Sequence, residues 1–319
     1  MAFLRFIAVR LVSSLATLLL ISFIVFSLME LVPGNCAERY IAYKNTQGQT
    51  ITEADIRAME VTMGLDRPFV ERWGGWVWGV FADGDFGTSC LIRADVTTIV
   101  GDKFWLSLAI CLGALALAYL IAVPVGILSA RERGGWSDSI LRFASYLGLA
   151  LPNFLLALII LLSATVFWKT DLTGLFSAEF REAPWTWAKF VDMLAHAWVP
   201  IVILGWSATA FALQTVRALV SDELDKLYVT AAMARGVTGR RLLWRYPARH
   251  ALGPLVNSVG FDLNRVFNEL PIVAVVLILT DAGKLLFDAL ARSNDQELAG
   301  AIIFMLTASI VGLNFLTDI

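Results

Sequence analysis

The segment LYVTAAMARGVTGRRLLWRYPARHALGP, from Leu227 to Pro254, lies between two long apolar stretches of the chain. It contains small residues, a glycine and a run of arginines, whereas its neighbours are almost entirely apolar. A polar segment in that position indicates a connection between two membrane-spanning helices. Its position relative to the other apolar stretches therefore decides the fold class.

The whole chain is 58% hydrophobic and only 16% charged, which is too apolar for a soluble globular surface. A transmembrane helix needs about 20 mostly apolar residues. Six stretches reach that length: Ala8–Val32, Phe104–Ser129, Ile140–Trp168, Leu194–Ala218, Pro254–Leu279 and Leu298–Leu316. None alternates with period 2, which favours helices over a barrel. The sequence predicts an all-α polytopic membrane protein with six transmembrane helices.

Basic residues set the predicted orientation, because short cytoplasmic loops are enriched in Lys and Arg. They gather on one side of a six-span arrangement: Arg5, Arg10, Arg131, Arg133, Arg142 and the basic residues between Asp222 and His250. That side is predicted to be the cytoplasm, with both termini on it. The first apolar stretch is too long for a signal peptide and no small-residue cleavage pattern follows it, so it is interpreted as an uncleaved anchor.

Three segments are predicted along the chain. Residues 1–32 hold the N-terminus and first helix, residues 33–103 form a small extracytoplasmic cap, and residues 104–319 form a five-helix core with a cytoplasmic loop at 220–253. Short helices are expected in the cap at Ile51–Met63 and Pro68–Val80. Trp73, Trp76 and Trp78 of the second could anchor the cap at the membrane interface or form its core, and the sequence leaves both open.

Two of the three cysteines, Cys36 and Cys90, share the predicted cap. In an oxidising compartment they could form a disulfide. The alternative is two unpaired thiols in a loop-rich segment.

The quoted segment has helix start and stop signals around it. Ser221 is a candidate N-cap, Asp222 and Glu223 suit the first turn, and Gly236 supplies a left-handed position just after Arg235. These signals predict a short separate helix from Asp222 to Arg235.

One face of that helix is predicted to be apolar with small residues at its centre, namely Leu224, Leu227, Tyr228, Ala231, Ala232 and Arg235. A further helix is expected to start with Arg240, after a second candidate cap at Thr238. The pair is either an amphipathic hairpin on anionic lipid or a docking element for a cytoplasmic partner.

The loop resembles the cytoplasmic EAA loop of binding-protein-dependent ABC importers, whose pattern is Glu-Ala-Ala, three residues, then Gly. Thr230 stands here in place of the glutamate, followed by Ala231, Ala232 and Gly236. The surrounding residues are similar to those of dipeptide and oligopeptide permeases: Tyr228, Val229, Ala232, Ala234, Gly236, Ala251, Leu252 and Pro254.

Further matches follow in order along nearly the whole chain: LVPGN at Leu31–Asn35, GLDRP at Gly64–Pro68, GDFGTS at Gly84–Ser89, VPVGILSA at Val123–Ala130, LALPNF at Leu149–Phe154 and AGKLL at Ala282–Leu286. The family usually has Asp where Asn35 stands. Similar proteins also continue with a short cytoplasmic tail after the position of Ile319.

The resemblance implies a type I ABC importer permease in the bacterial inner membrane, with a coupling helix that inserts into a cytoplasmic ATPase. The residues implied in that role are Leu227, Tyr228, Thr230, Ala231, Ala232, Arg235 and Gly236. The implied partners are a second, similar permease, one or two ATPase subunits and an extracytoplasmic solute-binding protein. The chain lacks a G-x-x-x-x-G-K-[ST] loop, so ATP and Mg²⁺ are expected on the ATPase subunits. No cofactor, metal, catalytic group or nucleic acid is expected on this chain.

The fifth apolar stretch is unusually polar, with Asp262, Arg265, Asn268 and Glu269 inside it. Arg265 is spaced to reach both acids on one helical face. Charges at membrane depth normally face a bundle interior or a water-filled path. These residues are therefore either part of the translocation path or an ion-pair cluster that fixes the helix to its neighbours.

The resemblance implies di- or oligopeptides as substrates, while related importers take nickel, opines or oligosaccharides, and no residue separates these. A secondary transporter with Asp262 and Glu269 as ion sites is the rival of another class, although six spans without a detectable inverted repeat are few for it. A non-transporting scaffold that recruits a partner through the basic loop is the other rival.

Overall fold

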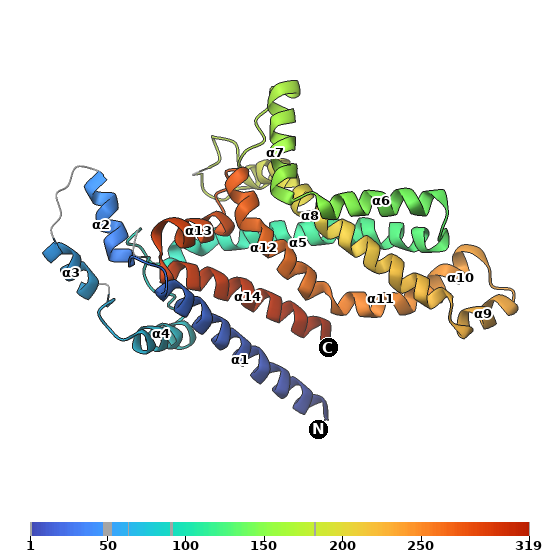
Figure 1. Cartoon of the computed structure of the whole chain (residues 1–319), viewed down its shortest axis with the longest axis horizontal. Coiled ribbons are helices and arrows are strands. Elements are labelled where there is room, and N and C mark those ends of the chain that lie inside the picture. Colours follow the sequence, from blue (N-terminus) through green and yellow to red (C-terminus); the bar gives the residue numbers. More distant parts are fainter. Residues whose placement is uncertain (1, 47–52, 63, 90–91, 182, 319) are drawn as a thin grey trace. The chain divides into compact units, whose positions relative to one another are not determined.

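The computed structural model describes residues 2–46, 53–62, 64–89, 92–181 and 183–318. Within these ranges helices joined by loops make up the chain, with one isolated antiparallel bridge between Thr88 and Asp95 (Figure 1). Contacts divide it into two compact units, Met1–Ser107 with Thr280–Val311, and Leu108–Leu279 with Gly312–Ile319. The all-α class is confirmed. The three segments predicted from the sequence follow the expected membrane topology, whereas the two units follow contacts within the structure. The predicted segments therefore stay a prediction.

The first unit contains helices from both ends of the chain: α1 (Ala2–Glu30), α2 (Cys36–Thr46), α3 (Glu53–Thr62), α4 (Phe69–Trp78), a π-helical turn at Gly79–Asp83, the start of α5 (Val96–Arg131), α13 (Ala282–Asp288) with a π-helical turn at Ala289–Ser293, and most of α14 (Gln296–Asp318). Helices α3 and α4 lie within a few residues of the two short helices predicted for the cap, a difference usual at helix ends. The extracytoplasmic location of this segment stays a prediction.

Two tryptophans of α4, Trp76 and Trp78, differ in burial, which bears on whether they are core residues or interface anchors. Trp76 is buried and packs against the rings of Phe26, Phe86 and Phe304, with centroids 5.0 to 6.4 Å apart. Trp78, two residues later, is 73% exposed. One tryptophan is therefore a core residue of this unit, while the other presents its ring to the surroundings.

Cys36, at the start of α2, takes part in a disulfide and is buried. Cys90, its predicted partner, lies outside the described residues, so the pairing stays a prediction.

The second unit is arranged around one long helix, α8 (Trp187–Leu224). Its members are the end of α5, α6 (Trp136–Ala150), α7 (Asn153–Ser163) with a π-helical turn at Ala164–Trp168, α8, α9 (Leu227–Ala234), α10 (Gly239–Arg245), α11 (Pro247–Asn257), α12 (Val259–Val276) and the end of α14. Helices α5, α6, α7, α11 and α12 pack against α8. Small residues permit the close packing: a Cβ added at Gly148 of α6 would lie 2.8 Å from that of Ala210 in α8. Helix α6 therefore lies directly on α8.

Among the residues that the structure describes, four helices are long and apolar enough to cross a membrane, at Arg5–Glu30, Val96–Arg131, Trp187–Leu224 and Gln296–Thr317. The bent pair α6 and α7 makes a fifth if it is counted as one span. Helix α12 occupies the fifth predicted stretch, but its charged residues keep it out of this group. The structure thus supports four or five apolar spans, and the count of six stays a prediction.

The third predicted stretch, Ile140–Trp168, is not one continuous helix. It is broken at Leu151 and Pro152, and the two halves meet at 95° (Figure 1). Leu151 is extended, with φ −89° and ψ 114°, because a proline disfavours the helical conformation of the residue before it and offers no N–H to continue the ladder. The break places Asn153 at the start of α7.

Candidate coupling segment and polar cluster

The helix predicted from Asp222 to Arg235 is two helices. Helix α8 continues through Leu224, and α9 begins at Leu227 after the extended residue Lys226, which has φ −79° and ψ 147°. Ser221 is therefore not an N-cap but a buried residue inside α8. The start signals were misleading because the preceding apolar helix extends past them.

The predicted end of the helix is confirmed. Gly236 has φ +80°, in the left-handed region that glycine adopts without a Cβ penalty. The N–H of Gly236 donates to the Met233 carbonyl at 2.9 Å, and that of Val237 donates to the Ala232 carbonyl at 3.1 Å. This pair of bonds is a Schellman motif, which closes α9 and turns the chain toward α10.

Helix α9 has an inner and an outer face. Val229 and Ala232 have no exposed surface and attach the helix to the unit. Leu227, by contrast, is 87% exposed, and the side chain of Met233 is also exposed. Of the predicted coupling residues, Ala232 is on the inner face and Tyr228 is half-buried, while the others lie outside: Leu227, Thr230, Ala231, Arg235 and Gly236.

Tyr228 ties α9 to the end of α8. Its hydroxyl donates to the Glu223 carboxylate at 2.5 Å, and its ring lies edge-on to that of His250, with centroids 5.0 Å apart. Burial and the hydrogen bond to Glu223 raise the pKa of Tyr228 to about 12. The hydroxyl consequently stays protonated at neutral pH and remains a donor.

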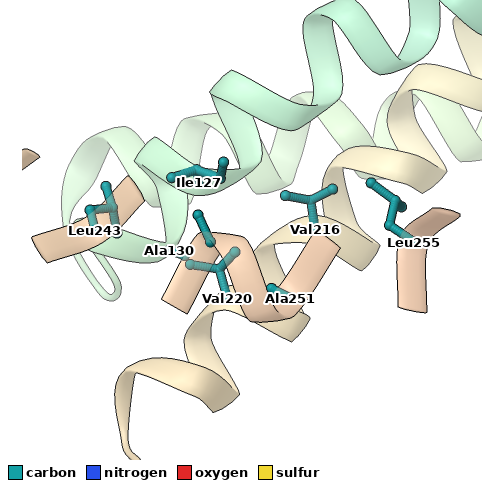
Figure 2. Packing of buried hydrophobic residues seen from close by; sticks show 8 residues of the cluster. Ile127, Ala130, Val216, Val220, Leu243, Ala251 and Leu255 are labelled. Carbon is teal, nitrogen blue, oxygen red and sulfur yellow. The ribbon is translucent and has the colours of Figure 1, made fainter. Parts of the chain in front are cut away.

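The base of the α9–α10 segment rests on an apolar cluster, shown in Figure 2. Its buried members come from α5, α8, α10 and α11: Ile127, Ala130, Val216, Val220, Leu243, Ala248, Ala251 and Leu255. Burial of apolar surface stabilises such a cluster without fixing direction. The segment is thereby held firmly against α8 and α5 at its base, while the outer face of α9 stays uncovered.

Basic side chains are exposed at the end of α9 and on the two helices that follow it. Those exposed along α9, α10 and α11 are Arg235, Arg240, Arg241, Arg245 and Arg249. The α10 helix also exposes part of Trp244. An exposed apolar face with arginines in the same segment suits an acidic groove or an anionic lipid surface.

Helix α12 carries the four polar residues predicted for the path, but the predicted arrangement is only partly correct. Asp262 is buried and accepts a hydrogen bond from the Tyr119 hydroxyl of α5 at 2.5 Å. The Ser258 hydroxyl lies 3.4 Å from the same carboxylate. Asp262 is therefore satisfied by hydroxyls rather than by Arg265.

Arg265 lies over the face of Phe211 in α8, with its guanidinium carbon 3.6 Å from the ring centroid. Among the described residues, no ion pair within 4.0 Å joins it to Asp262 or Glu269. The face of an aromatic ring attracts a cation electrostatically, so Phe211 provides a contact for the guanidinium. The expected bridge between both acids is not present.

Glu269 meets a small group from two other helices. Its carboxylate interacts with the side chains of Asn153 and Ser207. Asn153 is buried, and its Nδ2 donates to the Ser207 Oγ at 3.0 Å. Its Oδ1 has no hydrogen-bond partner within the part of the chain that the structure describes. The cluster of α7, α8 and α12 thus holds spare hydrogen-bonding capacity.

Sequence reasoning missed the residues that complete this cluster, namely Tyr119, Asn153, Ser207 and Phe211. Each lies in a different apolar stretch from Glu269, so no sequence spacing connects them. Asn153 and Ser207 are polar residues inside apolar stretches, and that is the signal that could have singled them out. Over the described ranges, no group of three or more His, Cys, Asp or Glu is placed to hold a metal ion.

Sequence comparisons identify the family of this apolar helical chain. The family described as binding-protein-dependent transport system inner membrane component matches residues 122–319, and the N-terminal part of that family matches residues 3–105. The chain belongs to this family. It is therefore a multi-pass inner membrane protein of the ABC permease type, a class of subunits that are not themselves enzymes.

Several relatives in this family are similar over most of their length. A putative peptide permease protein of Brucella ovis is 26% identical over 99% of this chain and 96% of its own. The dipeptide transport system permease protein DppB of Escherichia coli K12 is 25% identical over the same shares. The inner membrane ABC transporter permease protein YejB of Escherichia coli O157:H7 is 28% identical over 80% of this chain and 71% of its own.

Proposed function

We propose that this chain is a permease subunit of an ATP-driven importer of di- or oligopeptides, and that it forms half of the translocation path. The family membership and the relatives named for peptide and dipeptide transport support this function. A second, similar permease forms the other half. A solute-binding protein delivers the peptide on the extracytoplasmic side, where the segment at 33–103 contributes to its docking.

Helix α9 is the element that docks into a cytoplasmic ATPase subunit. The observation that carries this assignment is its divided surface, with Val229 and Ala232 fully buried and Leu227 almost fully exposed. An exposed leucine on a firmly seated helix has the form of an interface anchor. One or two ATPase subunits bind ATP and Mg²⁺, because this chain has no phosphate-binding loop of its own.

The uncovered side of α12 faces the path. Phe261, Asn264, Asn268 and Ile272 are exposed and share one helical face. Two asparagines against lipid would leave polar groups without partners, which is costly at membrane depth. We therefore assign this face to a water-filled route shared with the second permease. Arg265 and Glu269, which are half-buried at its edge, offer a cation and an anion to the two ends of a peptide.

This function requires six spans, with α12 among them and both termini in the cytoplasm. A helix with Asp262, Arg265 and Glu269 crosses a membrane when those groups face protein or water rather than lipid. The contacts of Asp262 with Tyr119 and of Arg265 with Phe211 support that condition.

Affinity purification from the native membrane, with ATPase activity measured on the product, tests the proposal. Wild type should bring down ATPase subunits and a second permease. Leu227→Asp should lose the ATPase subunits while the chain stays folded, because the Leu227 side chain contributes almost nothing to the core. Glu132→Ala, an exposed change on the turn between α5 and α6, is the matched control and should retain them.

A chain that purifies alone, or a Leu227→Asp variant that keeps its ATPase subunits, would contradict the coupling role of α9. Peptide uptake that survives ATP depletion but collapses with an uncoupler would instead favour an ion-coupled transporter with Asp262 and Glu269 as ion sites.

A further inference from the structure

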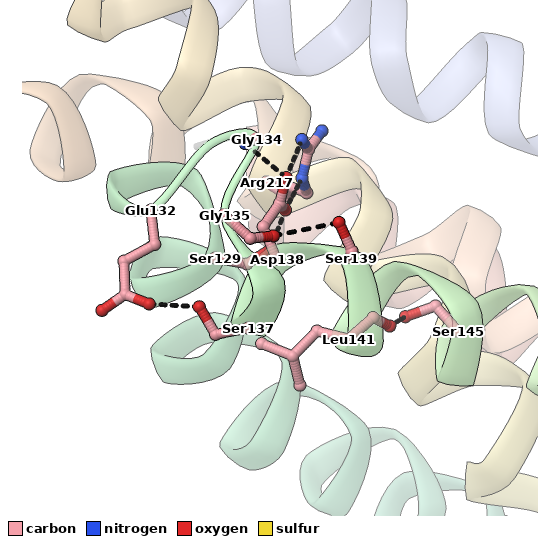
Figure 3. Close-up of polar contacts among 10 residues, drawn as sticks. All are labelled: Ser129, Glu132, Gly134, Gly135, Ser137, Asp138, Ser139, Leu141, Ser145 and Arg217. Carbon is pink, nitrogen blue, oxygen red and sulfur yellow. Dashed lines mark hydrogen bonds and ion pairs between the residues drawn. The ribbon is translucent and has the colours of Figure 1, made fainter.

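A charged pair is buried at the opposite end of α6 from the polar cluster. Asp138, in the first turn of α6, has no exposed surface, and the Arg217 side chain of α8 is only 16% exposed. Arg217 binds the carboxylate with two nitrogens, Nε to Oδ1 at 2.5 Å and Nη2 to Oδ2 at 2.8 Å. Figure 3 shows the two side chains facing each other across the helices.

Two further donors complete the site. The Ser129 hydroxyl of α5 donates to Oδ1 at 2.6 Å, and the Gly134 N–H donates to Oδ2 at 3.0 Å. Both carboxylate oxygens are thus fully used, by groups from α5, from the turn after it and from α8. A bidentate pair with saturated oxygens holds its partners in one geometry. These three segments are consequently joined at one point.

The joint lies next to the base of the coupling segment. Arg217 is on α8 between Val216 and Val220, two members of the apolar cluster in Figure 2. Helix α8 continues without interruption from Arg217 to Leu224, two residues before α9. A displacement of α9 therefore reaches Arg217 through the two connecting residues and about two turns of continuous helix.

The other partner leads to the polar cluster. Asp138 is on α6, which is helical as far as Ala150, and α7 then begins at Asn153. Asn153 is the residue that binds Ser207 and interacts with Glu269. Gly148 packs against Ala210 at this far end of α6. Helix α6 thus connects the buried pair to the group that we assign to the edge of the path.

We propose that Asp138 and Arg217 are positioning residues for the coupling of ATP hydrolysis to import, because their pair transmits displacement of α9 through α6 to Asn153. This inference rests on the proposed docking of α9 on an ATPase. The pair touches neither nucleotide nor peptide, and it acts through the helices that it joins. Without the pair, the ATPase subunits still hydrolyse ATP, but the displacement of α9 is no longer transmitted to α6.

A purely structural role makes a different prediction. Replacing a buried ion pair by apolar residues of similar size is commonly tolerated for folding, whereas removing one partner is not. A variant that lacks both charges therefore separates folding from coupling. Asp138→Leu combined with Arg217→Met serves this purpose, and Asp138→Asn serves as the milder change.

The test uses the complete importer, with both permeases, the ATPase subunits and the solute-binding protein, reconstituted in liposomes with a labelled dipeptide. Assembly, ATP hydrolysis and peptide import are measured for each variant. We expect both variants to assemble and to hydrolyse ATP within about twofold of wild type, with the ATP used per imported peptide raised at least about tenfold. Arg133→Gln, which breaks the exposed pair with Asp225 between the same two segments, should leave that ratio within about twofold.

The outcomes are distinguishable. A wild-type complex without peptide-stimulated ATPase activity would contradict the proposed function itself. With an active wild type, an unchanged ratio of ATP to peptide in the double variant would overturn the coupling role of the pair. Failure of both variants to assemble would overturn it as well, since the pair would then serve folding alone.

Discussion

The second unit contains two clusters of charged residues that are closed to different degrees. Around Asp138, four donors occupy both carboxylate oxygens. Around Glu269, the nearest arginine lies on an aromatic ring instead, and the Asn153 Oδ1 is without a partner among the described residues. Both clusters join α8 to a neighbouring helix, but only the first uses all of its hydrogen-bonding capacity.

The difference indicates what each cluster does. A saturated buried pair has nothing to offer a ligand and resists any change of geometry. A cluster with an unused acceptor carries an energetic cost that a ligand or water can relieve. The first therefore suits transmission of movement, and the second suits contact with a passing peptide. The first three predictions change one cluster and leave the other as a control, and the last changes an exposed ion pair outside both.

The largest effect is expected for Asp138→Leu alone. It leaves the Arg217 guanidinium buried without its carboxylate, and such a loss typically costs about 3–5 kcal/mol in the free energy of unfolding. The double variant Asp138→Leu/Arg217→Met should be more stable than the single one. Unfolding of the detergent-purified chain by denaturant measures both, and a single variant as stable as the double would refute the view that the pair is saturated.

Ser129→Ala and Ser207→Ala compare one hydroxyl from each cluster. The Ser129 hydroxyl donates to a charged acceptor, and a hydrogen bond of that kind is worth about 1.5–3 kcal/mol. Ser207 accepts from the neutral Asn153 amide and interacts with the carboxylate of Glu269, which is only half-buried, so about 0.5–1.5 kcal/mol is expected. The same unfolding experiment should show the larger loss for Ser129→Ala. Equal losses would mean that the two clusters do not differ in strength.

Glu269→Gln should separate stability from transport. The change keeps the shape of the side chain at a half-buried position, so we expect a loss of about 1 kcal/mol or less in the free energy of unfolding. Import by the reconstituted complex should nevertheless fall about tenfold, because the anion offered to the peptide is gone. Ser145→Ala on α6, which removes only a bond to the Leu141 carbonyl, should leave import unchanged. Normal import by Glu269→Gln would exclude Glu269 from the path.

The sequence predicted the elements better than their connections. The apolar stretches, the short helices α3 and α4, and the left-handed Gly236 follow from local composition and spacing. The break at Pro152 also had a local signal, since a proline restricts the residue before it. Its 95° angle did not, because packing of α7 against α8 and α12 sets that angle.

Pairings between distant residues could not be predicted in this way. Asp138 and Arg217 are 79 positions apart, and each alone resembles an ordinary charge near the end of an apolar stretch. Arg265 shows the opposite error: its spacing to both acids is right, yet Phe211 and Tyr119 from other helices provide the actual contacts. Helical spacing indicates which residues of one helix can contact each other. It does not indicate whether residues of neighbouring helices bind those side chains instead.

The smallest effect is expected for Arg133→Gln. Arg133 and Asp225 join the turn after α5 to the end of α8, as Asp138 and Arg217 do, but their side chains are 54% and 68% exposed. Water and salt screen such a pair, and exposed pairs contribute about 0–1 kcal/mol. At low salt and at about 0.5 M salt, Arg133→Gln and wild type should therefore differ by the same small amount in the free energy of unfolding, or not at all. A loss of unfolding free energy comparable to that of Asp138→Leu would show that the two ion pairs at this end of α8 act together. Burial would then not be the property that sets the Asp138–Arg217 pair apart from the exposed pair.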